Sequence, residues 1–198
     1  MFWGRSPGLL RGRLTAIASC EYSGQLVRID LRRERVTAYL HVGGSPQDVK
    51  LSPDGHTFSV ANRFLPNRHA SGVQLVDARP FRLAGFITTR LDAHGLYVAR
   101  DTRELYVTDR AGEAITVIDF STRRIVAVWR VAGAPDIGNV SPDGKILWVS
   151  SRYTSAVLAI STKTGHVIAS IKAGVSPHGV CVWLQPGRYS TGHTGVMR

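Results

Sequence analysis

The stretch that decides the fold is VSPDGKILWVSSRY, residues 140–153, because a near copy, LSPDGHTFSVANRF, occupies residues 51–64. A third copy, VARDTRELYVTDRA, aligns Asp101 with Asp54 and Asp143, at steps of 47 and 42 residues (101 − 54 and 143 − 101). A second series steps by 47, 42 and 42 residues, through Asp30, Asp77, Asp119 and Ser161. Both series take the longer step across FLPNRHASG, which indicates one loop insertion in a regular repeat.

A repeat near 42 residues that lacks helical periodicity is typical of a β-propeller blade of four antiparallel strands. Segments such as AITVIDF and RRIVAVWRV are rich in β-branched and aromatic residues, as strands are. The SPDG stretches between them supply Pro and Gly for tight turns. The sequence therefore predicts an all-β propeller.

The repeat predicts about four blades in this chain. One complete blade has strands near 47–52, 57–62, 73–77 and 81–88, and two more follow at 93–131 and 135–172. The N-terminal part supplies three strands, at 14–19, 25–30 and 35–42, and residues 178–184 align with the first strand of a blade. Two alternatives remain open: these terminal strands pair to close a four-bladed ring, or the chain is a fragment of a seven-bladed propeller.

The stretches LYVTDRAGEAITVIDFSTRRIVAVWRVAGAPD, SPDG and GVSPHGV resemble the YVTN-type β-propeller repeat family over residues 14–184. The resemblance implies a seven-bladed propeller, often exported or in the cell envelope, that binds a partner or a surface. Some relatives are lactonases. Seven such repeats need about 294 residues, more than the 198 present. We assign residues 1–13 to an N-terminal leader, 14–184 to the propeller and 185–198 to an irregular Gly-rich tail.

The composition is that of an ordinary globular protein with a basic surface. Hydrophobic residues make up 43% and charged residues 20%, and the formal net charge is +11. Only four of the 25 basic residues are lysines, so coding bias accounts for the charge as readily as nucleic-acid binding does. No segment is apolar over the ~18 residues of a membrane span, and the short apolar run at 14–19 is no convincing export signal. The compartment is therefore not decided by the sequence.

Two repeat positions carry polar side chains at the predicted mouth of the channel. The start of each first strand has Gln47, His94, Asp136 and His178. The end of each second strand has Asn62, Asp109 and Ser151, each followed by an arginine, Arg63, Arg110 and Arg152. Across each hairpin we expect the two positions to be close, which pairs Asn62 with Gln47, Asp109 with His94, and Ser151 with Asp136. The alternative is that these side chains only cap strand ends.

The pattern favours a non-catalytic binding scaffold that uses the channel mouth for a protein or a small polar or anionic ligand. His94, Asp136 and His178 are of the types that bind a divalent metal, with the arginines as an outer rim for anions. No motif demands a cofactor, and there is no nucleophile elbow. A lactonase-like or metal-dependent hydrolase is the alternative function, and a basic nucleic-acid binder is the third.

Overall fold

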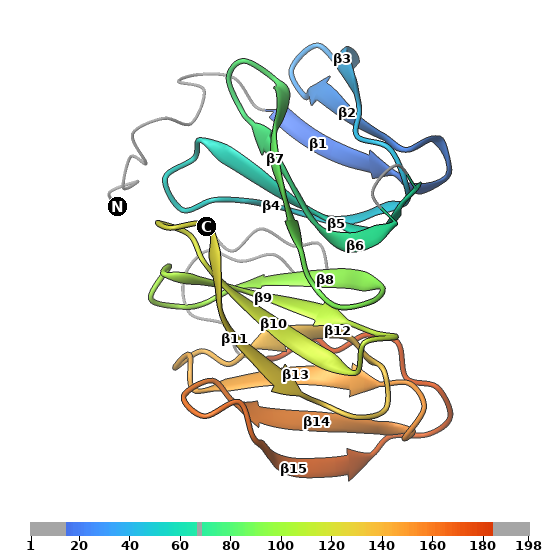
Figure 1. The fold of residues 1–198 in the computed structure, drawn as a ribbon, viewed down its shortest axis with the longest axis vertical. Coiled ribbons are helices and arrows are strands. Elements are labelled where there is room, and N and C mark those ends of the chain that lie inside the picture. Colours follow the sequence, from blue (N-terminus) through green and yellow to red (C-terminus); the bar gives the residue numbers. More distant parts are fainter. Residues whose placement is uncertain (1–14, 67–68, 184–198) are drawn as a thin grey trace.

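The computed structural model describes residues 15–66 and 69–183, which form four antiparallel sheets (Figure 1). The first blade has three strands, β1 (Thr15–Cys20), β2 (Gln25–Asp30) and β3 (Arg35–His41), with the short 3-10 helix η1 (Glu21–Ser23) after β1. The second blade contains β4 (Pro46–Leu51), β5 (Thr57–Leu65), β6 (Ala70–Asp77) and β7 (Arg82–Thr88). The third contains β8 (Ala93–Val98), β9 (Glu104–Asp109), β10 (Ala114–Asp119) and β11 (Arg124–Arg130). The fourth contains β12 (Pro135–Val140), β13 (Ile146–Ser151), β14 (Ala156–Ser161) and β15 (Val167–Lys172).

The blades follow one another in chain order as an arc, with the first and fourth at opposite ends (Figure 1). Their inner strands are neighbours, since β1 contacts β4, β4 contacts β8, and β8 contacts β12. Three apolar clusters fill the three interfaces between successive blades, with Val60, Leu96 and Leu147 among their fully buried members. Each blade thus buries its faces against its neighbours, which is why a single repeat is not sufficient.

The twin stretches are the same hairpin in two blades, as predicted. In each, a serine hydroxyl donates to the aspartate of the turn, Ser52 to Asp54 at 2.5 Å and Ser141 to Asp143 at 2.6 Å. The glycine of each turn has positive φ, 77° at Gly55 and 75° at Gly144. The turn chemistry therefore explains why the SPDG letters recur.

The predicted strands of the second to fourth blades agree with the structure to within a few residues. The all-β propeller fold is confirmed. The insertion lengthens the hairpin of β5 and β6, which have 9 and 8 residues where β9 and β10 have 6 each. The expected leader (1–13) and tail (185–198) lie outside the described residues.

The described residues do not form the closed four-bladed ring, which is one of the two alternatives that the sequence leaves open. There β1 pairs with β2 alone, and residues 178–183 form no strand. The hydroxyl of Ser150 in β13 donates to the carbonyl of His178 at 2.8 Å, so this segment stays beside the fourth blade. The first blade lies at the other end of the arc, and the observed open array agrees with the fragment alternative.

Within the described residues, the structure has no helix of the length and apolarity that a membrane span requires.

Candidate functional site

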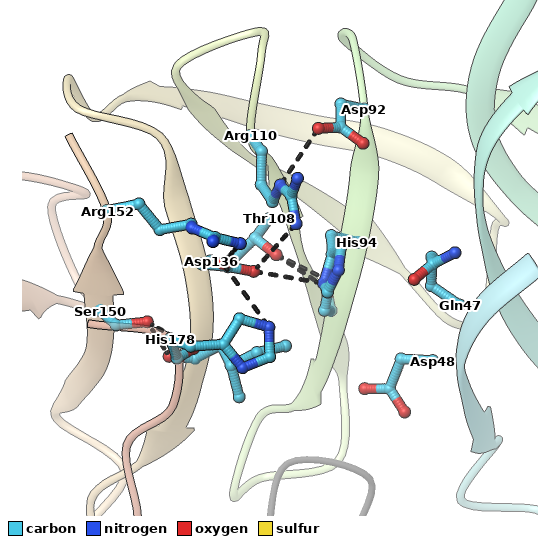
Figure 2. Close-up of polar contacts among 12 residues, drawn as sticks. Gln47, Asp48, Asp92, His94, Thr108, Arg110, Asp136, Ser150, Arg152 and His178 are labelled. Atoms are coloured by element: carbon cyan, nitrogen blue, oxygen red, sulfur yellow. Dashed lines mark hydrogen bonds and ion pairs between the residues drawn. The ribbon is translucent and has the colours of Figure 1, made fainter. Parts of the chain in front are cut away.

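Polar side chains meet where the inner strands begin, at the end of the array opposite the SPDG turns. His94 and Asp136 are the second residues of β8 and β12, and His178 lies in the segment that follows β15. Figure 2 shows these three side chains pointing toward one another, with Arg110 and Arg152 beside them. The structure therefore brings together the three residues that the sequence proposed as metal ligands.

Asp136 is at the centre of this cluster and is fully buried. Its Oδ1 lies 3.3 Å from His94 Nδ1 and 3.6 Å from Arg110 Nη1. Its Oδ2 lies 3.3 Å from Arg152 Nη1 and 3.9 Å from His178 Nε2. Four cationic or potentially cationic groups thus surround one buried carboxylate.

His94 is 9% exposed, and burial lowers its pKa from the usual 6.5 to about 4, although Asp136 acts in the opposite direction. The imidazole is therefore neutral at pH 7. His94 Nδ1 and Asp136 Oδ1 are both buried, and neither has a hydrogen-bond partner in the part of the chain that the structure describes. Buried polar atoms are rarely left this way, so this pair requires an explanation.

His178 is held by its backbone and by its ring. Ser150 Oγ lies 2.8 Å from the His178 carbonyl and 3.0 Å from the Ile137 carbonyl, so one hydroxyl links the segment to β12. The rings of His94 and His178 meet edge to face, with centroids 6.2 Å apart. His178 therefore faces the cluster although it belongs to no strand.

An ionic ladder of alternating charges crosses the blades at this end of the channel. It consists of Glu21, Arg63, Asp92, Arg110, Asp136 and Arg152. Arg63 links Glu21 of the first blade to Asp92, and Arg110 links Asp92, at 3.1 Å, to Asp136. The hydrogen bond from Arg63 to Asp92 raises the pKa of Arg63. Each arginine is therefore shared between two carboxylates or, for Arg152, between Asp136 and the Ser176 hydroxyl.

Sequence reasoning did not include Asp92 and Glu21 among the site residues. Asp92 stands two positions before His94, where the other repeats have Ser45, Ala134 and Ser176. That repeat position therefore shows no pattern of charge. Glu21 stands where the other repeats have arginine, so the partner of Arg63 could be found only by comparing charges between neighbouring blades.

The predicted pairs across each hairpin are wrong by one residue. Asn62, Asp109 and Ser151 lie opposite Pro46, Ala93 and Pro135, and a register shift follows each of these pairs. In each hairpin the following residue, Gln47, His94 or Asp136, falls in the register shift and has no Cα partner on the second strand.

Asn62, Asp109 and Ser151 instead bind nearby loops and strands. Asn62 accepts from Ser45 N and donates to the Gly43 carbonyl, and Ser151 donates to the Gly133 carbonyl. Asp109 accepts from the hydroxyls of Thr89 and Thr116, and its burial raises its pKa to about 6. For this repeat position the observed contacts are those of the capping alternative.

Gln47 also lies outside the cluster around Asp136. Its side-chain amide donates to Ser45 Oγ at 3.2 Å, and its backbone carbonyl accepts from the Ser19 hydroxyl. Figure 2 shows it on the far side of His94 from Asp136. Next to it, Asp48 pairs with Lys50 at 3.2 Å, and both are almost fully buried. That pair is structural, since Asp48 also accepts from Leu96 N of the next blade.

The spacing of the three central side chains matches a metal site. One ligand atom from each of His94, Asp136 and His178 lies within 4.8 Å of the other two. A tetrahedral ion with bonds of about 2.0–2.1 Å separates its ligands by about 3.3 Å, the distance from His94 Nδ1 to Asp136 Oδ1. The arrangement can therefore take a divalent ion with small movements of His178.

The fold and this channel end define a β-propeller with a polar, partly charged mouth. The YNCE-like beta-propeller family matches residues 12–186, and the chain belongs to this family. The chain is 25% identical to the seven-bladed beta-propeller protein Rv1057 of Mycobacterium tuberculosis, over 77% of this chain and 38% of that protein.

Solved structures share the fold at lower identity. Hydrazine synthase of Kuenenia stuttgartiensis matches with a TM-score of 0.72 and 23% identity, over 81% of this chain and 46% of that one. The dihydro-heme d1 dehydrogenase NirN, solved in complex with DHE, matches with a TM-score of 0.67 and 24% identity, over 83% of this chain and 35% of that one. The chain therefore spans between about a third and about a half of the length of these relatives.

Proposed function

We propose that this propeller is a binding module that holds a divalent transition-metal ion at its channel end through His94, Asp136 and His178. The observation that carries the proposal is the buried pair formed by His94 Nδ1 and Asp136 Oδ1. These atoms lie 3.3 Å apart, and neither has a hydrogen-bond partner in the described residues. A cation between them would satisfy both.

The energetic argument is that an unpaired buried polar atom is costly. Leaving one unsatisfied costs about 1–3 kcal/mol, and here two atoms without a hydrogen bond face each other, with the ionic contact of Asp136 Oδ1 to Arg110 at 3.6 Å beside them. The neutral imidazole of His94 keeps one nitrogen lone pair available at pH 7, as metal binding requires. These features support a metal ion as the ligand of the pair.

The donor set indicates the class of metal. Two imidazoles and one carboxylate suit zinc, iron, cobalt or nickel, whereas calcium and magnesium prefer oxygen ligands alone. Three protein ligands leave at least one coordination position for an exchangeable ligand. The side chain of Arg152 is 32% exposed beside Asp136, so a small anion is the ligand that this position favours.

Substitution of Arg152 tests the proposal, because metal binding and anion binding predict changes in affinity of opposite sign. Arg152 and a metal compete for Asp136, and the exposed side chain of Arg152 can turn toward solvent. Arg110 has Asp92 as its closer partner. Arg152→Gln should therefore tighten metal binding, by about 3- to 10-fold. If the cluster instead bound an anion without a metal, the same change would weaken binding.

The experiment is calorimetric titration of Zn²⁺ and Co²⁺ into protein treated with a chelator, with the visible spectrum of Co²⁺ as a second readout. His94→Ala and His178→Ala should each weaken binding by about 100-fold or more, because even outer partners of metal ligands contribute about 10- to 100-fold. His166→Ala, at an exposed histidine just before β15, is the matched control and should change nothing. Equal binding by the wild type and the His94→Ala, His178→Ala double variant would overturn the proposal.

A further inference from the structure

A second recess lies between the second and third blades, at the end of the array that carries the SPDG turns. It has a volume of about 420 Å³ and is bounded by the β4–β5 turn of one blade and the β10–β11 turn of the next. This is within the usual range for small-molecule sites, about 300–1,000 Å³. We call it the interblade cleft, and it is remote from His94 and Asp136, which lie where the inner strands begin.

The next interface along the chain shows what normally fills this place. Between the third and fourth blades, the rings of Tyr106 and Trp129 pack with centroids 5.3 Å apart. The fourth blade has Gly165 there, and a Cβ on it would come within 2.1 Å of the Trp129 ring. The Trp129 ring of the third blade therefore leaves no room for a side chain at position 165 of the fourth blade.

The interface between the first and second blades is filled in another way. Phe81 occupies the repeat position of Gly165, and its ring packs edge to face on Phe58 at 6.5 Å. The guanidinium of Arg28, from the first blade, lies over the same ring at 5.3 Å. Both flanking interfaces thus place an aromatic ring in this position.

The middle interface has no ring at these repeat positions, although Phe120 of the third blade packs against its apolar cluster and lines the cleft. Strand register puts Ser59 at the position of Tyr106 and Ile87 at the position of Trp129. Arg123, with φ of 56°, takes the position of Gly165 and Phe81. The interblade cleft is therefore the volume that an aromatic ring fills at the other two interfaces.

The lining of the interblade cleft is apolar below and charged at the rim. The aliphatic wall is made by Val73, Leu75, Ile87, Leu105 and Ile118. At the rim, Arg123 Nη2 donates to Thr57 Oγ1 at 3.3 Å across the interface, and Arg103 is a second exposed arginine.

The two carboxylates at the rim are already used by their own turns. Asp119 accepts from Ser121 and Thr122, and Asp54 accepts from Ser52 and His56 N. Both carboxylates keep their charge, and Asp54 interacts electrostatically with Arg123, whose guanidinium donates a hydrogen bond to Thr57.

We propose that the interblade cleft binds a planar aromatic carboxylate, with its ring where the neighbouring interface has Trp129 and its carboxylate on Arg123. An aromatic ring packs well against the aliphatic wall, and a guanidinium forms charge-assisted hydrogen bonds with a carboxylate. The ring of the bound ligand would occupy the place that Trp129 occupies at the neighbouring interface. The inference is independent of the metal site.

The test uses indole-3-acetate as the probe, titrated by calorimetry into the whole chain, with uncharged indole for comparison. Arg123→Gln should weaken indole-3-acetate binding by about 10-fold and leave indole binding unchanged. Arg124→Gln removes an exposed arginine one residue away, on the outer strand, and is the matched control that should change neither.

A filling variant, Ser59→Tyr with Ile87→Trp and Arg123→Gly, copies the next interface into the cleft. We expect it to retain a cooperative thermal transition and to lose binding of both probes. If it does not fold, the Arg123→Gln comparison decides alone. Equal affinity of the wild type and Arg123→Gln for indole-3-acetate, or binding retained by a folded filling variant, would overturn the proposal.

Discussion

At the scale of single residues, two buried groups have pKa values that are shifted in opposite directions, so that the order of the two values is reversed. Burial lowers the pKa of His94 to about 4 and raises that of Asp109 to about 6. Between pH 4 and 6 the unfolded chain binds more protons than the folded one at His94, and fewer at Asp109. The two contributions to the free energy of unfolding therefore have opposite slopes in this range and largely cancel.

We predict that single substitutions reveal these slopes in metal-free protein. The contribution of Asp109 is present below pH 4 and is lost as pH rises through about 6, so relative to Asp109→Asn the wild type should lose up to about 3 kcal/mol over that range. The contribution of His94 is lost as pH falls from about 6.5 to about 4, so relative to His94→Gln the wild type should gain stability with rising pH, again by up to about 3 kcal/mol. Urea unfolding at several pH values measures both.

Asp109→Asn is a mild change, because the repeat has Asn62 at this position in the second blade. Exposed His166 serves as the control for the histidine, and His166→Gln should leave the slope unaltered. Parallel stability curves for the wild type and both variants would show that neither group titrates abnormally.

At the scale of elements, the hydroxyl of Ser150 helps to hold the segment after β15 against the fourth blade. Ser150 of β13 is fully buried and contacts the carbonyls of Ile137 and His178. In the previous repeat the same position is Thr108, whose hydroxyl accepts from Gly95 N at 2.7 Å. A hydroxyl at this position therefore links β-strand and neighbouring backbone in both blades.

We predict that Ser150→Ala weakens Zn²⁺ binding by about 3- to 10-fold, because His178 is then less well positioned and one hydrogen bond is worth about 1 kcal/mol. Ser150→Thr, which restores the hydroxyl in the form used by Thr108, should return the affinity to within about 2-fold of the wild type. Calorimetry measures both variants. The role of Ser150 would be disproved by an unchanged affinity in Ser150→Ala.

Elements were easier to predict than contacts between them. The strands could be predicted from the repeated SPDG turns and the runs of β-branched residues, because both act on the local backbone conformation. The bulges at the start of β4, β8 and β12 were not visible, since Pro46, Ala93 and Pro135 give no sign of a register shift. The trio of His94, Asp136 and His178 was found because it occupies one repeat position, whereas Asp92 was missed because its repeat position is not polar in every blade.

At the scale of the whole molecule, the described blades form an open arc whose first blade ends in an unpaired strand. The edge of β1 that faces away from β2 has no strand partner among residues 15–66 and 69–183. Ile17 packs toward the second blade, so the alternating Ala16 and Ala18 face away from it. Unpaired edges of this kind promote association between chains.

We predict that the 198-residue chain self-associates as its concentration rises and that Ala18→Lys suppresses this, because a charge on an edge strand opposes pairing. Sedimentation velocity over a concentration series measures the effect. Ala111→Lys adds the same charge to an exposed position in the β9–β10 turn, away from any strand edge, and should leave association unchanged. A wild type that stays monomeric at the highest concentration would refute the prediction.

The ionic ladder also has a consequence for how such an array can grow by duplication. If residues 93–134 were copied in tandem, Arg110 of the first copy would face a second His94 in place of Asp136, while keeping Asp92. Arg110 of the second copy would keep Asp136 but face Ala134 in place of Asp92. Two arginines would then divide the carboxylates that one now holds. The blades are therefore not interchangeable, because each arginine of the ionic ladder needs the particular carboxylates of its neighbouring blades.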